Sequence, residues 1–126
     1  MGDAAFSEEA IDWITALSGE KRLVRGTHDD LPTTSYLRAF SEIYGLYKYK
    51  GMWLSHAPIH PDELRGKPSV HGHCHYANIQ LDGKDDPRYL NCCVENFSRC
   101  LARPLATLDE VRNYFKTGEL IPIGHI

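Results

Sequence analysis

The stretch "SVHGHCHYANI" (residues 69–79) places three histidines and one cysteine within five consecutive positions. Its first three residues have the character of a short strand, and Gly72 permits a tight turn directly after them. His73 and His75 lie two positions apart, a spacing that directs both side chains to one face of an extended chain. His71 belongs to the strand itself, so we expect a structural role for it.

Polar clusters follow apolar strands at two other places in the chain. "RLVR" runs directly into "GTHDD" (together residues 22–30), and "MWLSH" (52–56) ends on a serine and a histidine. In layered α/β folds, sites assemble in the loops beyond the strand ends. His28 and His56 are therefore expected to approach the histidines of the first stretch. With carboxylates nearby, this arrangement predicts a metal site.

The chain of 126 residues has the composition of an ordinary soluble globular protein, with 42% hydrophobic and 25% charged residues. Its length suits one domain, residues 1–126, with a single core. The 17 acidic and 14 basic residues argue against a broad nucleic-acid-binding surface, although a local basic patch is compatible with them. No apolar run approaches the roughly 20 residues of a membrane span, and no signal peptide opens the chain. We expect a cytoplasmic protein without a membrane contact.

The four cysteines, Cys74, Cys92, Cys93 and Cys100, lack the paired C-x-x-C spacing of a structural zinc site. The adjacent Cys92 and Cys93 are a poor basis for a disulfide framework, so all four are expected to be reduced. Cys74 points away from its neighbouring histidines if the segment is extended. We expect it to be a small buried apolar residue.

Two helices are expected in the first third of the chain. Ser7 has the position of an N-cap, with carboxylates in the following turn. One apolar stripe at helical spacing follows, and Gly19 ends it; the stripe consists of Ala10, Trp13, Ile14 and Leu17. A second helix is expected over residues 35–43, and its inward residues are Leu37, Phe40 and Ile43.

Strands are expected to dominate from Gly45 onward. The candidate segments are "LYKYK" (46–50), "MWLSH" (52–56), "VHGHCH" (70–75), "YANIQL" (76–81) and "RYLNCCVEN" (88–96). Lys50–Gly51 and "DGKDDP" (82–87) are expected turns, and the loop 57–67 is expected to hold one helical turn at 61–64. A capping box at Thr107–Glu110 opens a final helix through about Lys116. The pattern predicts a mixed α/β fold.

The order of the polar motifs resembles the calcineurin-like metallophosphoesterases, which show G-D, G-N-H-D, a lone H and G-H-x-H. The matching segments are "GD" (2–3), "GTHD" (26–29), "LSH" (54–56) and "HGHCH" (71–75). Residues 2–30 look like the family's stretch from the G-D strand to the G-N-H-D loop. Residues 89–115 resemble the closing strand and helix of small bacterial and phage members. The resemblance implies a truncated form of the family's sandwich of mixed sheets flanked by helices.

The resemblance also implies a set of metal ligands. Asp3 matches the G-D aspartate, which bridges two metal ions in the family. His56 and His73 match ligands of the second metal, and His75 matches a ligand of the first. Imidazole and carboxylate donors suit a divalent ion such as Mn, Fe, Ni or Zn.

Two further residues match the family's catalytic positions, and two features depart from its pattern. His28 matches the histidine that stabilises or protonates the phosphoester, and Asp29 matches the carboxylate that orients it. The D-x-H motif is absent, so the family's opening strand and its two ligands are expected to precede Met1. Thr27 replaces the asparagine and lacks an amide carbonyl. The second metal position retains three protein ligands and the first retains two, so one ion is expected rather than two.

Two functions remain open at this point. One is metal-dependent hydrolysis of a phosphomonoester or phosphodiester, impaired by the two departures. The other is a catalytically inactive binding or regulatory protein of the inhibitor type on a degenerate phosphoesterase scaffold. An exposed sheet edge left by the missing strand favours a homo-oligomer or a protein partner. A hydrolase with Cys74 or Ser55 as nucleophile is a third hypothesis, but no nucleophile elbow supports it.

Overall fold

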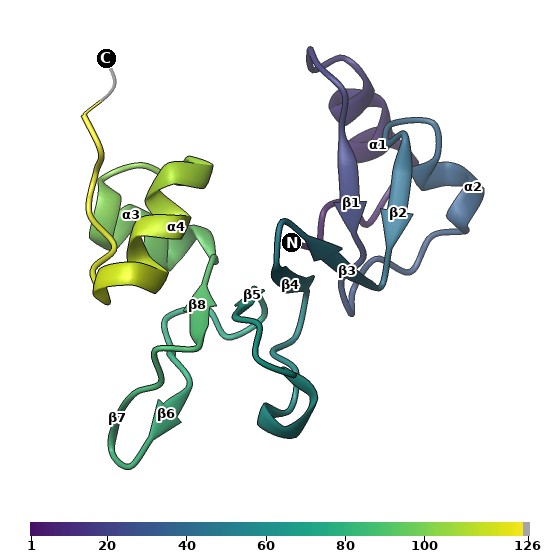
Figure 1. Ribbon diagram of the computed structural model, residues 1–126. Helices are drawn as coiled ribbons and strands as arrows, with labels where there is room; N and C mark the ends of the chain where they lie inside the picture. Colours follow the sequence, from purple (N-terminus) through teal and green to yellow (C-terminus); the bar gives the residue numbers. More distant parts are fainter. Residues whose placement is uncertain (125–126) are drawn as a thin grey trace.

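The computed structural model describes residues 1–124, in which short helices and mixed sheets alternate (Figure 1). The last two residues of the expected domain lie outside this range. The helices are α1 (Glu8–Thr15), α2 (Thr33–Tyr36), α3 (Val94–Leu101) and α4 (Leu108–Thr117), with a 3-10 turn η1 (Pro61–Glu63). The strands are β1 (Arg22–Val24), β2 (Glu42–Tyr44), β3 (Leu46–Tyr49), β4 (Met52–Ser55), β5 (Ser69–His71), β6 (Gln80–Leu81), β7 (Lys84–Asp85) and β8 (Tyr89–Asn91).

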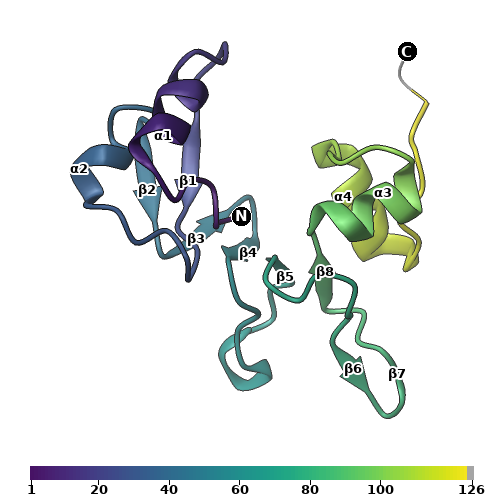
Figure 2. The same ribbon diagram turned by 180° about the vertical axis from the view of Figure 1, so that it is seen from behind.

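A four-stranded sheet of order β3-β4-β5-β8 occupies the middle of the molecule. Strands β4, β5 and β8 are parallel, while β3 pairs with β4 in the antiparallel direction. Strands β1 and β2 form a separate parallel pair with α1 and α2 beside it, and α3 and α4 lie at the opposite end, beyond β8 (Figures 1 and 2). Strands β6 and β7 form a small hairpin. The predicted mixed α/β character is confirmed.

The N-terminal helix begins as predicted but buries a different face. Ser7 is its N-cap and accepts a hydrogen bond from the Ala10 amide at 3.2 Å. Ile11 is fully buried, and Ala10 and Ile14 of the predicted stripe pack against the core, whereas its other two members, Trp13 and Leu17, are 71% and 63% exposed. The helix ends at Thr15, four residues before the glycine that was expected to end it. The buried side is the one that packs against β1 and α2.

The second predicted helix is wrong in its length. It spans four residues, and Glu42–Tyr44 forms β2 instead. Pairing of Ile43 with Leu23 of β1 explains the difference, because a long-range strand partner outweighs the local helical spacing. Phe40 is buried as expected, while Leu37 is 52% exposed.

Helix α3 was not predicted, because its sequence was assigned to the end of a strand. The strand stops at Asn91, and Cys93 is the N-cap of the helix. Phe97 and Leu101, one helical turn apart, pack with Leu90 of β8 in a second core cluster. Helix α4 packs on the same cluster and begins with the predicted capping box.

The turns agree with the sequence except at one place. The helical turn η1 and the Lys50–Gly51 turn are confirmed, and both residues of that turn have positive φ. Residues 82–87 were expected to form a turn alone, but they include β7, which pairs with β6 across Asp82–Gly83. The longest helix, α4, has ten residues, and no helix within residues 1–124 has the length and hydropathy of a membrane span.

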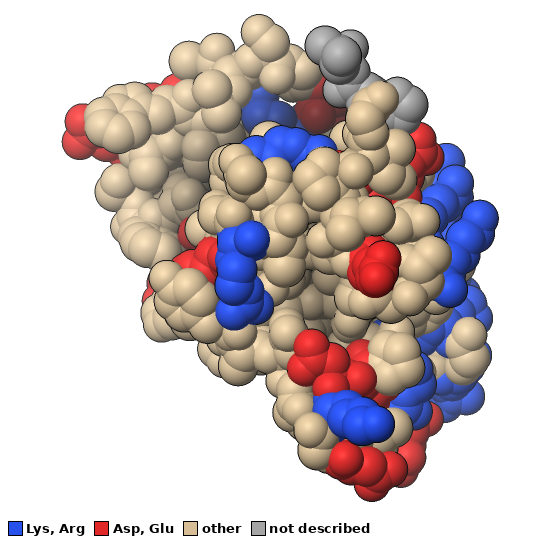
Figure 3. Space-filling view, turned by 90° about the vertical axis from the view of Figure 1, so that its left-hand side faces the viewer, with Lys and Arg blue, Asp and Glu red and all other residues tan. Residues whose placement is uncertain are grey.

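Each sheet has edge strands with no second strand partner within residues 1–124, among them β1 and β8. Strand β1 pairs with β2 on one side, and β8 pairs with β5 on one side, so each has one edge without a ladder. On the face shown in Figure 3, Lys and Arg gather along one margin and the middle is largely uncharged.

Candidate metal centre

A cavity of about 290 Å³ lies where the N-terminal segment meets the carboxyl ends of the three parallel strands. Its lining comes from four segments: Met1–Asp3, His56 after β4, Gly72–His75 after β5 and Cys92–Glu95 after β8. Parallel strands bring their carboxyl ends to one edge of a sheet, so residues far apart in the sequence meet here. A larger cavity of about 430 Å³ beside η1 is lined by none of the chain's His, Cys, Asp or Glu side chains.

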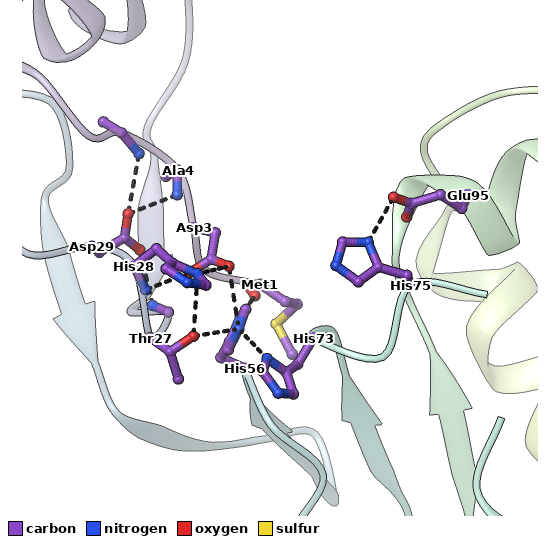
Figure 4. Close-up of polar contacts among 12 residues, drawn as sticks. Met1, Asp3, Ala4, Thr27, His28, Asp29, His56, His73, His75 and Glu95 are labelled. Carbon is purple, nitrogen blue, oxygen red and sulfur yellow. Dashed lines mark hydrogen bonds and ion pairs between the residues drawn. The ribbon is translucent and has the colours of Figure 1, made fainter. Parts of the chain in front are cut away.

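Three of the four predicted metal ligands approach one another at this cavity (Figure 4). The Nε2 atom of His56 lies 3.1 Å from Nδ1 of His73 and 3.5 Å from Oδ2 of Asp3. We call Asp3, His56, His73 and the adjacent His28 the aspartate–histidine cluster. Its members come from the N-terminal segment and from the ends of three different strands, so tertiary structure alone assembles it.

The proton positions on His56 follow from its partners. Its Nδ1 lies 2.7 Å from the Met1 carbonyl oxygen, which accepts hydrogen bonds and cannot donate. Nδ1 of a neutral His56 therefore carries the proton, and Nε2 presents a lone pair to Asp3 and His73. This orientation by a backbone carbonyl is typical of metal-binding histidines.

Asp3 is held in place although it is close to the chain terminus. Its Oδ1 accepts the His28 amide at 2.8 Å, and its Oδ2 lies 3.1 Å from the His28 ring. Burial acts to raise the pKa of Asp3, but the hydrogen bonds from His28 and the charges of His28 and His56 outweigh it and lower the pKa. The backbone approaches so closely that a Cβ at Gly26 would overlap Asp3, which explains the glycine there.

Asp29 holds the N-terminal segment rather than the His28 ring. Its buried carboxylate accepts hydrogen bonds from the amides of Ala4 at 2.7 Å, Ala5 at 3.1 Å and Gly26 at 2.9 Å. The resemblance implied that Asp29 orients His28, but the carboxylate beside that ring is Asp3. Asp29 thus fixes the N-terminal segment that carries Asp3 to the loop after β1.

His28 is exposed beside Asp3. Its hydrogen bond to Asp3 and the negative charge of that carboxylate raise the pKa of the imidazole. The neighbouring Thr27 has its hydroxyl 3.4 Å from Nε2 of His56 and 3.5 Å from Nδ1 of His28. Thr27 therefore reaches the cluster with a hydroxyl where the family has an amide.

His75, the fourth predicted ligand, lines the same cavity but has a different partner. Its Nδ1 lies 3.0 Å from Oε1 of Glu95, and Figure 4 shows this pair on the opposite wall from the cluster. We call these two residues the His75–Glu95 pair. His73 and His75 have φ angles of 68° and 53°, so they belong to a tight left-handed loop rather than to an extended strand.

Sequence reasoning missed Glu95 and Asn91. Glu95 belongs to the first turn of α3, which was not predicted. Asn91 is buried at the end of β8 and ties down the histidine loop by donating to the carbonyls of His75 and Ala77. The Glu after an N-cap position would have identified the helix start, but the apolar run before it favoured a strand.

His71, Cys74 and Ser55 have environments that make their side chains unreactive. His71 is fully buried in β5, and burial lowers its pKa. Cys74 is half-buried rather than fully buried, and burial raises the pKa of its thiol. The Ser55 hydroxyl donates to the Ala57 carbonyl at 2.5 Å. A thiol with a raised pKa and a hydroxyl committed to the backbone are both poor nucleophiles.

The donor types and spacings of the cluster fit a divalent ion. Ligand atoms at roughly 2.0–2.1 Å from a tetrahedral ion lie about 3.3–3.4 Å from one another. The separations of 3.1 and 3.5 Å at His56 are close to that value. Within residues 1–124, however, no three His, Cys, Asp or Glu side chains already surround a common point. The side chains contact each other, so ion binding requires them to turn outward rather than to come together.

Comparison of the chain with protein-family models, curated proteins and solved structures gave no match.

Proposed function

We propose that this protein is a metallophosphoesterase-like protein that hydrolyses a phosphomonoester or phosphodiester with the help of a divalent metal ion. The observation that carries the proposal is the approach of Asp3, His56 and His73 within 3.1–3.5 Å at one cavity. These are three of the residues that the family resemblance selects as metal ligands. Their positions in the sequence are 17 to 70 residues apart, so local structure does not explain their meeting.

Asp3, His56 and His73 would hold one ion of Mn, Fe, Ni or Zn, with His75 facing it from the other wall. A bound ion of this kind activates a water molecule and polarises a phosphoester oxygen. His56 already presents its Nε2 lone pair, because its Nδ1–H donates a hydrogen bond to the Met1 carbonyl. For its Nδ1 to serve as a ligand, His73 moves its proton to Nε2 and gives up its hydrogen bond to His56.

His28 would supply a proton from its place beside Asp3. Asp3 accepts at Nδ1 of His28, so Nε2 of the protonated ring is directed elsewhere and can donate to a phosphoester oxygen. The raised pKa keeps this proton on the ring to a higher pH than in an ordinary histidine. His28 is 69% exposed, which leaves it open to a substrate.

A catalytically inactive binding or regulatory protein is the second candidate function. Thr27 offers a hydroxyl instead of an amide oxygen, and the cluster's side chains bond to one another rather than surround an open point. The edge of β1 without a ladder gives such a protein a surface for a partner strand or a second copy. The threonine at position 27 and the mutual bonding of the cluster side chains also reduce the expected turnover of the enzyme.

Metal content and phosphoester cleavage test the proposal together. We would measure bound metal by elemental analysis and cleavage of p-nitrophenyl phosphate and bis(p-nitrophenyl) phosphate with added Mn²⁺ or Zn²⁺. About one ion per chain and metal-dependent cleavage are expected, both lost in His73→Ala. His60→Ala is the matched control, because His60 is an exposed loop histidine capping η1. A folded chain without bound metal contradicts the metal-dependent hydrolase and supports the binding protein, as does bound metal without cleavage.

A further inference from the structure

The cavity of about 430 Å³ beside η1 lies at the amino ends of strands β5 and β8, away from the carboxyl ends that bear the proposed metal site. Two of its lining residues, Pro68 and Arg88, directly precede β5 and β8, whereas His73 follows β5. The two cavities share no lining residue. The volume of this second cavity is within the range of sites that bind small organic molecules.

Trp53 of β4 fixes one apolar wall of this cavity. Its indole N–H donates to the Leu64 carbonyl at 2.8 Å, and its amide donates to the Pro68 carbonyl at 2.9 Å. Leu64 is 3% exposed, so the wall belongs to the packed interior. Phe115 and the rings of the lining prolines add further apolar surface. Because both ends of the segment 64–68 are bonded to the central sheet, the cavity does not have to be ordered by its ligand.

Every ionisable side chain in the lining is basic, namely Arg65, Lys67 and Arg88, so we call this the basic cavity. Asp86, which is 2% exposed, accepts from Nε of Arg88 at 3.0 Å and from Nη2 at 2.7 Å. This bidentate contact fixes the guanidinium and leaves Nη1 for another acceptor. Arg65 lies 3.6 Å from Glu63, but the two side chains are 73% and 64% exposed, so this ion pair is weak.

Lys67 differs from the two arginines in its partners. Within residues 1–124 no Asp or Glu forms an ion pair with its ammonium, which lies 5.7 Å from the centre of the Trp53 ring. Its amide closes a turn by donating to the Leu64 carbonyl at 3.0 Å, and the central residues of this turn, Arg65 and Gly66, have φ angles of 51° and 79°. These angles favour glycine and not arginine, so backbone preference does not explain Arg65. The lining thus has a positive charge that the protein leaves uncompensated.

We propose that the basic cavity binds a small organic anion, in which a carboxylate or phosphate group is attached to an apolar or aromatic body. Lys67 and Nη1 of Arg88 bind the anionic group, and Leu64 and Phe115 contact the body. Ammonium and guanidinium groups suit carboxylate and phosphate oxygens alike. This site needs no metal ion, so it goes beyond the proposed function and does not depend on it.

An NMR titration of the ¹⁵N-labelled protein in EDTA locates and measures this binding in the absence of metal. The probes are 3-phenylpropionate and phenylphosphonate, and the tighter of the two identifies the preferred anionic group. Both should shift the amides of Gly66, Lys67 and Arg88, with a Kd of about 1 mM or lower. The neutral 3-phenylpropionamide, which lacks the charge, and inorganic phosphate, which lacks the body, should each bind about tenfold more weakly.

Substitution of Lys67 tests the source of the selectivity. Lys67→Met, which removes the charge and keeps an apolar stem, should weaken both anions about tenfold and leave binding of the neutral amide unchanged. Lys84→Met, at an exposed lysine of β7 outside the cavity, is the matched control and should change nothing. Circular dichroism checks the fold of each variant. Lys67→Gln gives the same comparison if the methionine variant does not fold.

Several results would overturn the inference. They are equal binding of 3-phenylpropionate and its neutral amide, equal effects of Lys67→Met and Lys84→Met, and no shift of the cavity amides at about 10 mM of either anion. Shifts confined to the amides of His28 and His73 would place the anion at the aspartate–histidine cluster and overturn it as well. His73→Ala separates the two proposals, because it should abolish metal binding and leave the affinity for both anions unchanged.

Discussion

In the aspartate–histidine cluster, Asp3, His28, His56 and His73 contact one another beyond the strand ends, whereas His75 bonds to Glu95 on the opposite wall. The cluster depends on the N-terminal segment, which buried Asp29 holds through three backbone amides. The His75–Glu95 pair depends on Asn91, which fixes a loop and a helix start. The two walls belong to one cavity but are stabilised by different buried polar residues, so each can be weakened separately.

The largest effect is expected from Asp29→Ala, which breaks the cluster side. The change leaves three backbone donors, one buried and two partly buried, without their carboxylate. We expect a loss of about 3 kcal/mol in the free energy of unfolding, because buried unpaired donors cost about 1–3 kcal/mol each and partly recover water. Urea denaturation measures it, and Asp30→Ala, its exposed neighbour, is the control. Equal effects of the two changes would contradict this role of Asp29.

Asn91→Ala should disrupt the wall that holds the His75–Glu95 pair, with a smaller loss in the free energy of unfolding than Asp29→Ala. It removes two hydrogen bonds to carbonyls and one from an amide, worth about 2 kcal/mol together. The contact between His75 and Glu95 should also be weakened, while the His56–His73 contact is retained. Urea denaturation and NMR of the two histidine groups check this. Asn113→Ala on α4 serves as the control, and a change confined to the cluster side would contradict the separation of the walls.

Thr27→Asn should raise the metal affinity of the aspartate–histidine cluster and leave the His75–Glu95 pair unchanged. The Thr27 hydroxyl already lies 3.4 Å from Nε2 of His56, so an asparagine carbonyl at this position can reach the same region. We expect affinity for Mn²⁺ or Zn²⁺ to rise about tenfold, equivalent to about 1.4 kcal/mol. Calorimetric titration measures it, with Thr117→Asn at the end of α4 as the control. Unchanged affinity would mean that position 27 does not face the ion.

The smallest effect concerns the pH dependence of the His28–Asp3 pair in the metal-free protein. The His28 pKa is raised above 6.5, so its contribution to stability is complete below that value and is lost as pH rises through the folded-state pKa. The Asp3 pKa is lowered below 3.8, so its contribution is present above that value and is lost as pH falls through the folded-state pKa. The pair therefore stabilises the protein most between about pH 3.8 and pH 6.5, where Asp3 is ionised and His28 is protonated.

Asp3→Asn tests this pair directly. The substitution should return the His28 pKa toward its ordinary value, because it removes the charge that raises it. An NMR titration of the His28 ring measures the change, and Asp62→Asn, in η1, should leave it unaltered. A wild-type His28 pKa at or below 6.5 would contradict the pairing.

The parts of the fold that could be predicted from the sequence have strong local causes. The Ser7 N-cap, the Lys50–Gly51 turn and the capping box at Thr107–Glu110 depend on hydrogen bonds or backbone angles within a few residues. Helix periodicity was less informative. Local spacing favoured Trp13 over Ile11 for the buried face, and the packing of β1 and α2 decided otherwise.

Strand β2 and helix α3 show why the remaining elements were missed. Residues 42–44 form a strand because β1 lies beside them, and residues 94–101 form a helix because Phe97 and Leu101 find Leu90. Neither partner is visible from the short segment itself, whose own propensity is weak. Long-range contacts therefore override the local pattern where that pattern is short.

The sequence by itself predicted a set of site residues from motifs in order: Asp3, His28, His56, His73 and His75. Only the tertiary structure decided how they divide, with His73 facing His56 and His75 facing Glu95, although the two histidines are neighbours in the sequence. The reason is the left-handed loop after β5, which turns two side chains expected on one face toward opposite walls. The tertiary structure likewise assigned Asp3 rather than Asp29 to the His28 ring, because backbone amides already occupy the buried carboxylate of Asp29.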